Sequence, residues 1–202
     1  MVTLEAEPTT GRRTLLLEAA HDVVAHVGFH RATVKAIAAR AGVATGSVYT
    51  YFASRQELLA QVFTRAASIE LAAVEHAVEN AQHGSADRIA TQVQALVDTF
   101  ARRAFANRTL AWALLSEPAG ELIAEQRLAF RRRYAVVMES IIATGVDTGA
   151  IAHQDPRVVA PGLIGLISES LAGPLSPHRT VAVDHLISEV QRMCLRAIGA
   201  SS

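Results

Sequence analysis

The chain has 202 residues, of which 50% are hydrophobic and 5% aromatic, and its formal net charge at pH 7 is zero. This composition suffices for one large domain or two small ones with a core, and it argues against a disordered chain. No apolar run approaches the roughly 18 residues of a membrane-spanning helix, and the first residues lack the pattern of a secretory signal. The single cysteine, Cys194, excludes an intrachain disulfide and favours a cytoplasmic protein.

Charge is unevenly distributed along the chain. Residues 12 to 65 hold seven Lys or Arg against three acids, a net charge of +4. Residues 66 to 202 hold twelve Arg against fourteen acids, a net charge of −2. A compact basic segment can face an anionic partner such as nucleic acid, but a solvated surface with chance asymmetry explains the same numbers equally well.

Apolar side chains recur at helical spacing from the start of the chain, and hairpin signals are missing, so the sequence predicts an all-α protein. The first helices are expected at about residues 12–27, 34–41, 45–51 and 54–82. Gly28 should end the first helix in a left-handed conformation, and Thr33 and Gly42 should cap the second. Ser54 and Glu57 form a capping box for the fourth, which the segment His83-Gly84-Ser85 should break.

The later helices are longer and bring the expected total to about nine. They are predicted at about residues 87–106, 108–116, 120–143, 155–172 and 179–198. Asn107 and Asp155 are expected N-caps. Pro161 either kinks its helix or delays the regular part to near residue 160, and a rigid link is expected at Gly173-Pro174 and Ser176-Pro177.

The two short helices around Gly42 have the proportions of a helix-turn-helix, which inserts one helix into the major groove of DNA. The start of the helix at 45–51 carries small hydroxyl side chains and free backbone amides, which suit phosphate. Tyr49 can reach phosphate oxygens. Helix–glycine–helix segments also occur in other helical proteins, so the spacing alone leaves DNA binding open.

The run from Gly28 to Leu59, GFHRATVKAIAARAGVATGSVYTYFASRQELL, resembles the DNA-binding signature of the TetR (tetracycline-repressor) family of bacterial transcription regulators. The matching elements are Gly28-Phe29, Thr33, Ile37-Ala38, Ala41-Gly42-Val43, Tyr49-Thr50-Tyr51-Phe52 and Ser54-Arg55-Gln56-Glu57-Leu58-Leu59, in order and without gaps. The resemblance covers only the first third of the chain.

The resemblance implies a ligand-responsive DNA-binding transcriptional regulator, by default a repressor. Such a protein binds a palindromic operator as a dimer and is released by a small, largely apolar ligand, which moves the helix at 54–82. The implied domains are an N-terminal DNA-binding domain at 1–53, ordered from about residue 12, and a helical ligand-binding and dimerisation domain at 54–202.

The DNA contacts that the resemblance and the residue chemistry suggest are Thr33, Lys35, Arg40, Thr45, Gly46, Ser47, Tyr49, Thr50 and Arg55. Two positions depart from the family pattern. Ala44 stands where Ser or Thr is common, so the cap of the recognition helix is weaker or moves to Thr45. Thr45 is itself small where Lys or Gln is common, so direct base readout should be thin and DNA shape should matter more.

Aromatic side chains at roughly helical spacing in the middle helices suit an apolar ligand pocket, and they suit an ordinary core equally well. The expected ligand-binding residues are Phe100, Phe105, Trp112, Phe130, Arg131, Tyr134 and Met138. Arg127 and Arg131 share a helix face, and an inward-pointing arginine could pair with a carboxylate or phosphate, although such clusters are more often solvated.

The last two helices carry apolar stripes, and Gly162 and Gly165 permit close backbone approach. These helices are expected to meet a twofold partner as a four-helix bundle, with ordinary intrachain core as the alternative. The expected dimer residues are Leu163, Ile167, Leu171, Leu186, Ile187, Val190 and Cys194.

Catalytic and metal-binding motifs are missing from the sequence, so an enzyme, a cofactor and a metal site are not expected. Cys194 should be an inert buried thiol. The expected partners are double-stranded DNA, a second copy of the chain and a small effector, with no membrane. The alternative is a helical adaptor or enzyme that kept the fold without operator binding.

Overall fold

The computed structural model describes residues 8–81, 87–176 and 179–200. Within these ranges the chain is entirely helical, which confirms the predicted all-α class. The helices are α1 (Pro8–Arg31), α2 (Val34–Ala41), α3 (Thr45–Val48), α4 (Arg55–Asn80), α5 (Arg88–Ala106), α6 (Arg108–Leu115), α7 (Glu121–Asp147), α8 (Pro156–Leu175) and α9 (Val183–Ile198). The predicted break at His83-Gly84-Ser85 and the link residue Pro177 lie outside the described residues.

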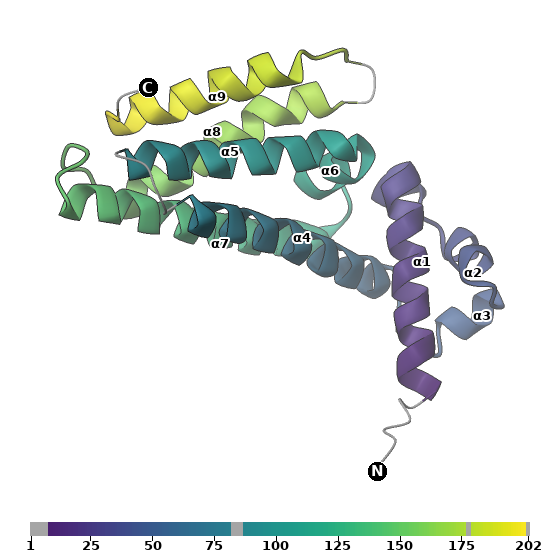
Figure 1. The fold of residues 1–202 in the computed structure, drawn as a ribbon. Helices are drawn as coiled ribbons and strands as arrows, with labels where there is room; N and C mark the ends of the chain where they lie inside the picture. Colours follow the sequence, from purple (N-terminus) through teal and green to yellow (C-terminus); the bar gives the residue numbers. More distant parts are fainter. Residues whose placement is uncertain (1–7, 82–86, 177–178, 201–202) are drawn as a thin grey trace, which may run out of the picture.

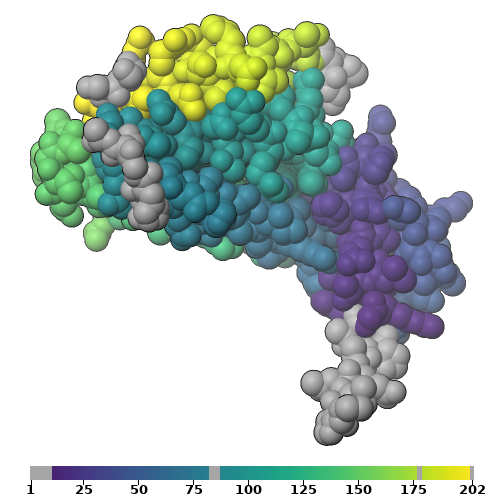
Figure 2. Space-filling model, viewed as in Figure 1, coloured from purple at the N-terminus to yellow at the C-terminus, as the bar shows by residue number. Residues whose placement is uncertain are grey.

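Helices α1, α2 and α3 form a small unit at one end of the molecule, and α5, α7, α8 and α9 are stacked at the other (Figure 1). The small unit stands out from the helical body as a separate lobe (Figure 2). Helix α4 packs against α1 and also against α5 and α7, so it contributes to both parts. Helix α6 packs against α1, α5 and α8, which gives the body a second contact with the small unit.

The N-terminal caps lie where the sequence predicts them. The Oγ1 atom of Thr33 accepts from the amide of Ala36 at 3.2 Å and begins α2. The Oγ atom of Ser54 accepts from the amide of Glu57 at 3.0 Å and begins α4. The carboxylate of Glu57 accepts from the amide of Ala53 at 2.7 Å, one residue before the cap, which completes a capping box.

Helix α3 ends at Val48, earlier than the predicted Tyr51. The amides of the next three residues donate to carbonyls three positions back, so the chain continues as tight turns rather than as an α-helix. The N-cap of α3 is Ala44, and no side chain bonds there, which confirms the predicted weak cap. The conformation of α3 therefore depends on tertiary packing.

The expected link at Gly173-Pro174 is wrong, because both residues lie within α8. The guanidinium of Arg108, at the start of α6, donates to the carbonyls of Pro174 and Ser176 at 2.6 and 2.8 Å. These bonds satisfy carbonyls that the helix end leaves free, so α8 extends past the proline. Helix α8 also begins at Pro156 and contains Pro161, so its regular part is not delayed to residue 160.

Helix α8 is long and apolar enough to cross a membrane by length and composition, with a mean hydropathy of 1.5. Polar residues interrupt its apolar stretches, so the sequence shows no long apolar run there. The helix packs against α5, α6, α7 and α9, as a core helix of a folded domain does. Only 39% of its most apolar window is buried, however. An apolar outer face therefore remains uncovered in the single chain.

Gly28 breaks α1 three residues before its end. Its φ of 79° has the predicted positive sign, but its ψ of 175° is extended rather than left-handed helical. This region of backbone space is essentially restricted to glycine. A Cβ atom at this position would lie 2.7 Å from Oε2 of Glu117, in the segment between α6 and α7, so a side chain here would displace the Glu117 carboxylate.

We predict that Gly28→Ala lowers the free energy of unfolding by about 1–3 kcal/mol, because alanine would hold a strained backbone. Gly11→Ala is the matched control, since it lies in the regular part of α1 with nothing within 4 Å of the added Cβ. It should stabilise the protein by about 0.4–1 kcal/mol. Urea unfolding followed by circular dichroism measures both, and equal effects of the two substitutions would contradict this account of Gly28.

Candidate functional site

Helix α3 and the turn after it present polar residues to solvent and apolar residues to the core. Thr45 and Gly46 are exposed, and the Tyr49 side chain is 55% exposed. Val48 and Phe52 are each only 1% exposed. Val48 and Phe52 anchor this segment in the core of the small unit. The side that carries Thr45, Gly46 and Tyr49 is exposed and can contact a partner.

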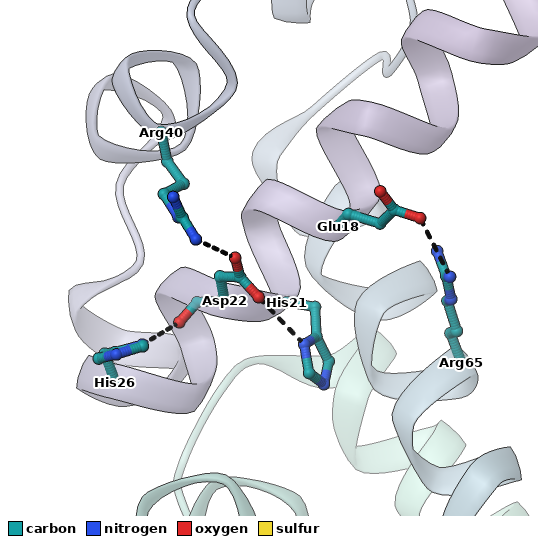
Figure 3. Close-up of polar contacts among 6 residues, drawn as sticks. All are labelled: Glu18, His21, Asp22, His26, Arg40 and Arg65. Atoms are coloured by element: carbon teal, nitrogen blue, oxygen red, sulfur yellow. Dashed lines mark hydrogen bonds and ion pairs between the residues drawn. The ribbon is translucent and has the colours of Figure 1, made fainter.

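Two further predicted DNA-binding residues lie beside this surface on α2. Lys35 is exposed on the first turn of α2. Arg40, in the last turn, makes an ion pair with Asp22 of α1 at 2.6 Å (Figure 3). The Arg40 side chain nevertheless remains 60% exposed. This ion pair links α2 to α1 and leaves part of the guanidinium facing solvent.

Figure 3 also shows Glu18 of α1 directed at Arg65 of α4, at 3.5 Å. Both side chains are about half exposed, so this pair contributes little stability. It adds a second orientation-dependent contact between the small unit and α4, beside the buried apolar packing of α1 on α4.

Arg55 is occupied by the protein itself. Its Nε atom donates to the carbonyl of Ala32 at 2.8 Å, and its Nη2 atom donates to the carbonyls of Phe29 and His30. These bonds attach the first turn of α4 to the segment between Gly28 and Thr33. The structure gives Arg55 a positioning role at this junction, and a phosphate contact would have to compete with three carbonyls.

A partly open cavity in the body is lined by residues of α4, α5, α6, α7 and α8 and has a volume of about 100 Å³. Its apolar lining comprises Phe63, Ala67, Leu96, Phe100, Ala104, Leu110, Ala111, Leu114, Leu115, Phe130, Ile164 and Ile167. The polar lining residues are Glu70, Arg103, Asn107, Arg127, Arg131, Tyr134 and Ser168. Such a mixture of an apolar wall and a few polar groups is typical of a small-molecule site.

Most of these polar groups have partners. Arg103 and Glu70 form a bidentate pair, at 2.5 and 3.0 Å. Tyr134 and Ser168 differ, since they are only 9% and 5% exposed and their hydroxyls bond to no described residue. Burial raises the pKa of Tyr134 well above its usual value, so the phenol stays neutral. These two hydroxyls are free to bond to a ligand in the cavity.

The predicted ligand-binding residues divide into two groups. Phe100, Phe130, Arg131 and Tyr134 line the cavity. Phe105, Trp112 and Met138 do not, and Met138 is fully buried in the core. Sequence reasoning missed Phe63 and Ser168, which come from α4 and α8 and share no motif with the middle helices.

The structure corrects the predicted dimer residues. Leu163, Ile167, Leu171, Ile187, Val190 and Cys194 are each at most 3% exposed within the single chain, and Leu186 is half-buried. The six buried side chains are intrachain core, because their helices pack on α5 and α7 and on each other. Burial also raises the pKa of the Cys194 thiol to about 12, in keeping with an inert thiol.

In the part of the chain that the structure describes, no group of three or more His, Cys, Asp or Glu residues could hold a metal ion.

We predict that Arg55→Met lowers the free energy of unfolding by about 2 kcal/mol, because three carbonyls lose a charged donor. Lys35→Met removes an exposed cation from the same unit and should leave stability within about 0.5 kcal/mol of the unsubstituted protein. Chemical unfolding of both variants measures the difference. An unchanged Arg55→Met midpoint would exclude the positioning role.

Comparison with known proteins agrees with this geometry. Residues 16–62 match the model of the tetR family of bacterial regulatory proteins. The fatty acid metabolism regulator protein of Bacillus subtilis is 40% identical over 48 residues, a match that covers 24% of this chain and only 25% of that protein. The match thus lies within the length of one small domain and leaves most of both proteins unmatched.

Solved structures are similar over nearly the whole chain. The transcriptional regulator FadR of Bacillus subtilis, in complex with stearoyl-CoA, has a TM-score of 0.76 at 20% identity, covering 92% of this chain and 98% of that one. The fatty acid degradation regulator FadR of Bacillus halodurans has a TM-score of 0.72 at 19% identity, covering 90% and 97%. A TetR/AcrR-family regulator of Thermobifida fusca has a TM-score of 0.68 at 22% identity, covering 92% and 97%. At these identities the likeness establishes the fold. Residues 16–62 therefore match the tetR family of bacterial regulatory proteins, and the rest of the chain shares the fold of the solved TetR-family regulators.

Proposed function

We propose that the protein is a cytoplasmic, ligand-responsive transcriptional regulator, a repressor that binds a palindromic operator as a dimer. The observation that carries this proposal is the helix-turn-helix surface: α3 is seated by buried Val48 and Phe52 and directs small polar residues outward. A cavity of about 100 Å³ lies in the body behind this unit. The domain division at 53/54 belongs to the proposal, with α4 bridging the two parts.

The DNA contacts follow from exposure. Tyr49, Thr50 and Lys35 are exposed and can bond to phosphate oxygens, which fixes the position of the protein on the duplex. We assign contacts with base edges to the exposed Thr45 and the partly exposed Ser47, at the start of α3. Both side chains are short, so their contacts discriminate weakly and DNA shape contributes more of the specificity.

The dimer forms through the outer face of α8 and α9. This face is apolar or small: Val158 and Met193 are 70% and 39% exposed, Gly162 and Gly165 are exposed, and Leu186 is half-buried. The exposed glycines permit close approach of two copies about a twofold axis. Such a dimer would place two α3 helices about 34–36 Å apart, one turn of DNA.

The ligand is an apolar chain with an anionic end. Around the cavity, Arg103, Arg127 and Arg131 outnumber the single carboxylate of Glu70. Arg131 is exposed at the cavity and forms no ion pair with any described residue. The regulators of Bacillus subtilis and Bacillus halodurans carry names that concern fatty acids, and one structure contains stearoyl-CoA. A long-chain acyl-CoA or fatty acid satisfies the same chemistry here.

Ligand binding would shift a conformational equilibrium. The cavity volume of about 100 Å³ is below the roughly 300 Å³ at which sites for drug-sized ligands begin, so a long chain must displace the walls. A ligand that prefers the displaced form by about 2.7 kcal/mol lowers DNA affinity about a hundredfold. Displacement of α4 or α6 would reach the small unit, since both pack on α1.

We predict that the protein binds near-palindromic DNA upstream of its own gene, with affinity that falls steeply as salt rises. Tyr49→Phe should lower the affinity for every DNA sequence by about fivefold, since one hydrogen bond to phosphate, of about 1 kcal/mol, is lost. Ser47→Ala should instead change the order of preference among operator variants. Fluorescence anisotropy measures both, and persistent failure to bind genomic DNA would favour the adaptor function.

A second prediction concerns the ligand. Trp112, the only tryptophan, lies on α6 beside the cavity wall, so its fluorescence should report titration with stearoyl-CoA. Arg131→Met should lower the affinity for stearoyl-CoA about tenfold and leave the affinity for neutral stearyl alcohol unchanged, because only the acyl-CoA carries charge. Arg132→Met, at the next residue of α7, which is also exposed but does not line the cavity, is the control and should change neither. Equal weakening by the two substitutions would contradict a specific role of Arg131.

A further inference from the structure

We propose that Glu117 is a positioning residue that couples the cavity to the helix-turn-helix, through a hydrogen-bonded path formed by Arg127, Glu117, the backbone of Phe29 and His30, and Arg55. The regulatory meaning of this path rests on the proposed function. The path itself is a property of the fold and can be tested without DNA or ligand.

At one end, Glu117 holds the last turn of α1. Its Oε2 atom accepts from the amide of Phe29 at 2.7 Å, and its Oε1 atom accepts from the amide of His30 at 2.9 Å. These amides follow the break at Gly28, whose missing side chain makes room for the carboxylate. Two charge-assisted bonds from one carboxylate fix both the distance and the orientation of this turn.

The same turn is held from its other side by α4. Arg55 donates to the carbonyls of Phe29 and His30, so the two residues bond to a carboxylate through their amides and to a guanidinium through their carbonyls. Arg55 also bonds to the carbonyl of Ala32, which precedes Thr33, the N-cap of α2. A shift of this turn therefore moves the start of the helix-turn-helix and the start of α4 together.

At the other end, Arg127 connects Glu117 to the cavity. The guanidinium lines the cavity and donates to the carbonyls of Ala113, Leu114 and Glu117 at 3.2, 2.8 and 2.8 Å. Leu114 also lines the cavity. Burial, together with the nearby positive charge of Arg131, lowers the pKa of Arg127, so an anionic ligand would change its electrostatic environment directly.

The path explains how a ligand could act over this distance. A ligand larger than the present cavity can displace the α6 wall or Arg127, and Arg127 is bonded to the end of α6 and to the backbone of Glu117. Because the Glu117 carboxylate bonds across to α1, this displacement is transmitted to the turn at Phe29 and His30. Two arrangements of one bonded network are what an allosteric switch requires.

The first experiment is amide hydrogen exchange by NMR on the full-length protein. Arg127→Met removes the donor without touching α1, and we expect the amides of Phe29 and His30 to exchange at least tenfold faster. Arg132→Met is the matched control and should leave both rates unchanged. Thermal unfolding of the two variants checks global stability. Unchanged Phe29 and His30 rates in a folded Arg127→Met protein would overturn the path.

Glu117→Gln tests the path in the opposite direction and serves if Arg127→Met does not fold. Glutamine keeps the size of the side chain but replaces one acceptor by a donor, so one of the two amide bonds is lost. We expect a changed Nε–H resonance of Arg127, whose Nη2 atom donates to the backbone carbonyl of Glu117 and which also lies within the electrostatic influence of the Glu117 charge. An unshifted Arg127 resonance alongside faster Phe29 exchange would overturn transmission through Glu117.

The second experiment measures coupling to DNA. Ala111 lines the cavity from α6, and the phenyl group of Ala111→Phe would occupy cavity volume in place of a ligand. It should weaken binding to the upstream DNA at least tenfold, and less than threefold when Glu117→Gln is also present. Equal weakening in both backgrounds, or none in either, would overturn coupling through Glu117. If the unsubstituted protein binds no DNA, the proposed function fails, while the exchange measurements still decide the path.

Discussion

The single turn that follows Gly28 determines how the two parts of the molecule are joined. Its amides bond to the carboxylate of Glu117 and its carbonyls bond to the guanidinium of Arg55. A backbone segment held by opposite charges on its two sides cannot rotate or slide without breaking charge-assisted bonds. This constraint acts on the orientation of the small unit together with the packing of α1 on α4 and α6.

Helix α6 contacts the small unit through α1 and also lines the cavity. Its N-terminus is fixed to the end of α8 by Arg108, and its C-terminal carbonyls are fixed by Arg127. The middle of the helix forms one wall of the cavity. This eight-residue helix is therefore hydrogen-bonded at both ends, to α8 and to α7.

The sequence predicts those features that depend on neighbouring residues. Thr33, Ser54 and Asn107 cap helices as expected, because the cap bond runs to an amide a few residues away. Gly28 breaks α1 as expected, but its extended ψ depends on Glu117, which lies far along the chain. Local rules cannot anticipate a conformation that a distant carboxylate stabilises.

The cavity and the dimer face could be predicted only in outline. The apolar stripe of α9 is visible in the sequence, but periodicity does not tell which surface covers it, and α5 of the same chain does so. The expected ligand-binding residues of the middle helices likewise could not be told apart from the sequence. Phe100 and Tyr134 pack edge to face, with ring centroids 5.3 Å apart, and line the cavity, whereas Met138 is buried in the core. The direction of each side chain depends on helix crossing angles, which the sequence does not specify.

Helix α3 has little intrinsic stability and depends on the packing around it. The helix has four residues and no side-chain cap, so its geometry is maintained by the α2 turn and by the burial of Val48 and Phe52. Phe52 in turn packs beneath Arg13 of α1, whose guanidinium lies 5.0 Å from the ring centroid. A recognition helix with strong intrinsic stability would keep its shape whatever happened to α1. Here a rotation of α1 would move Arg13 away from Phe52 and change the packing on which α3 rests.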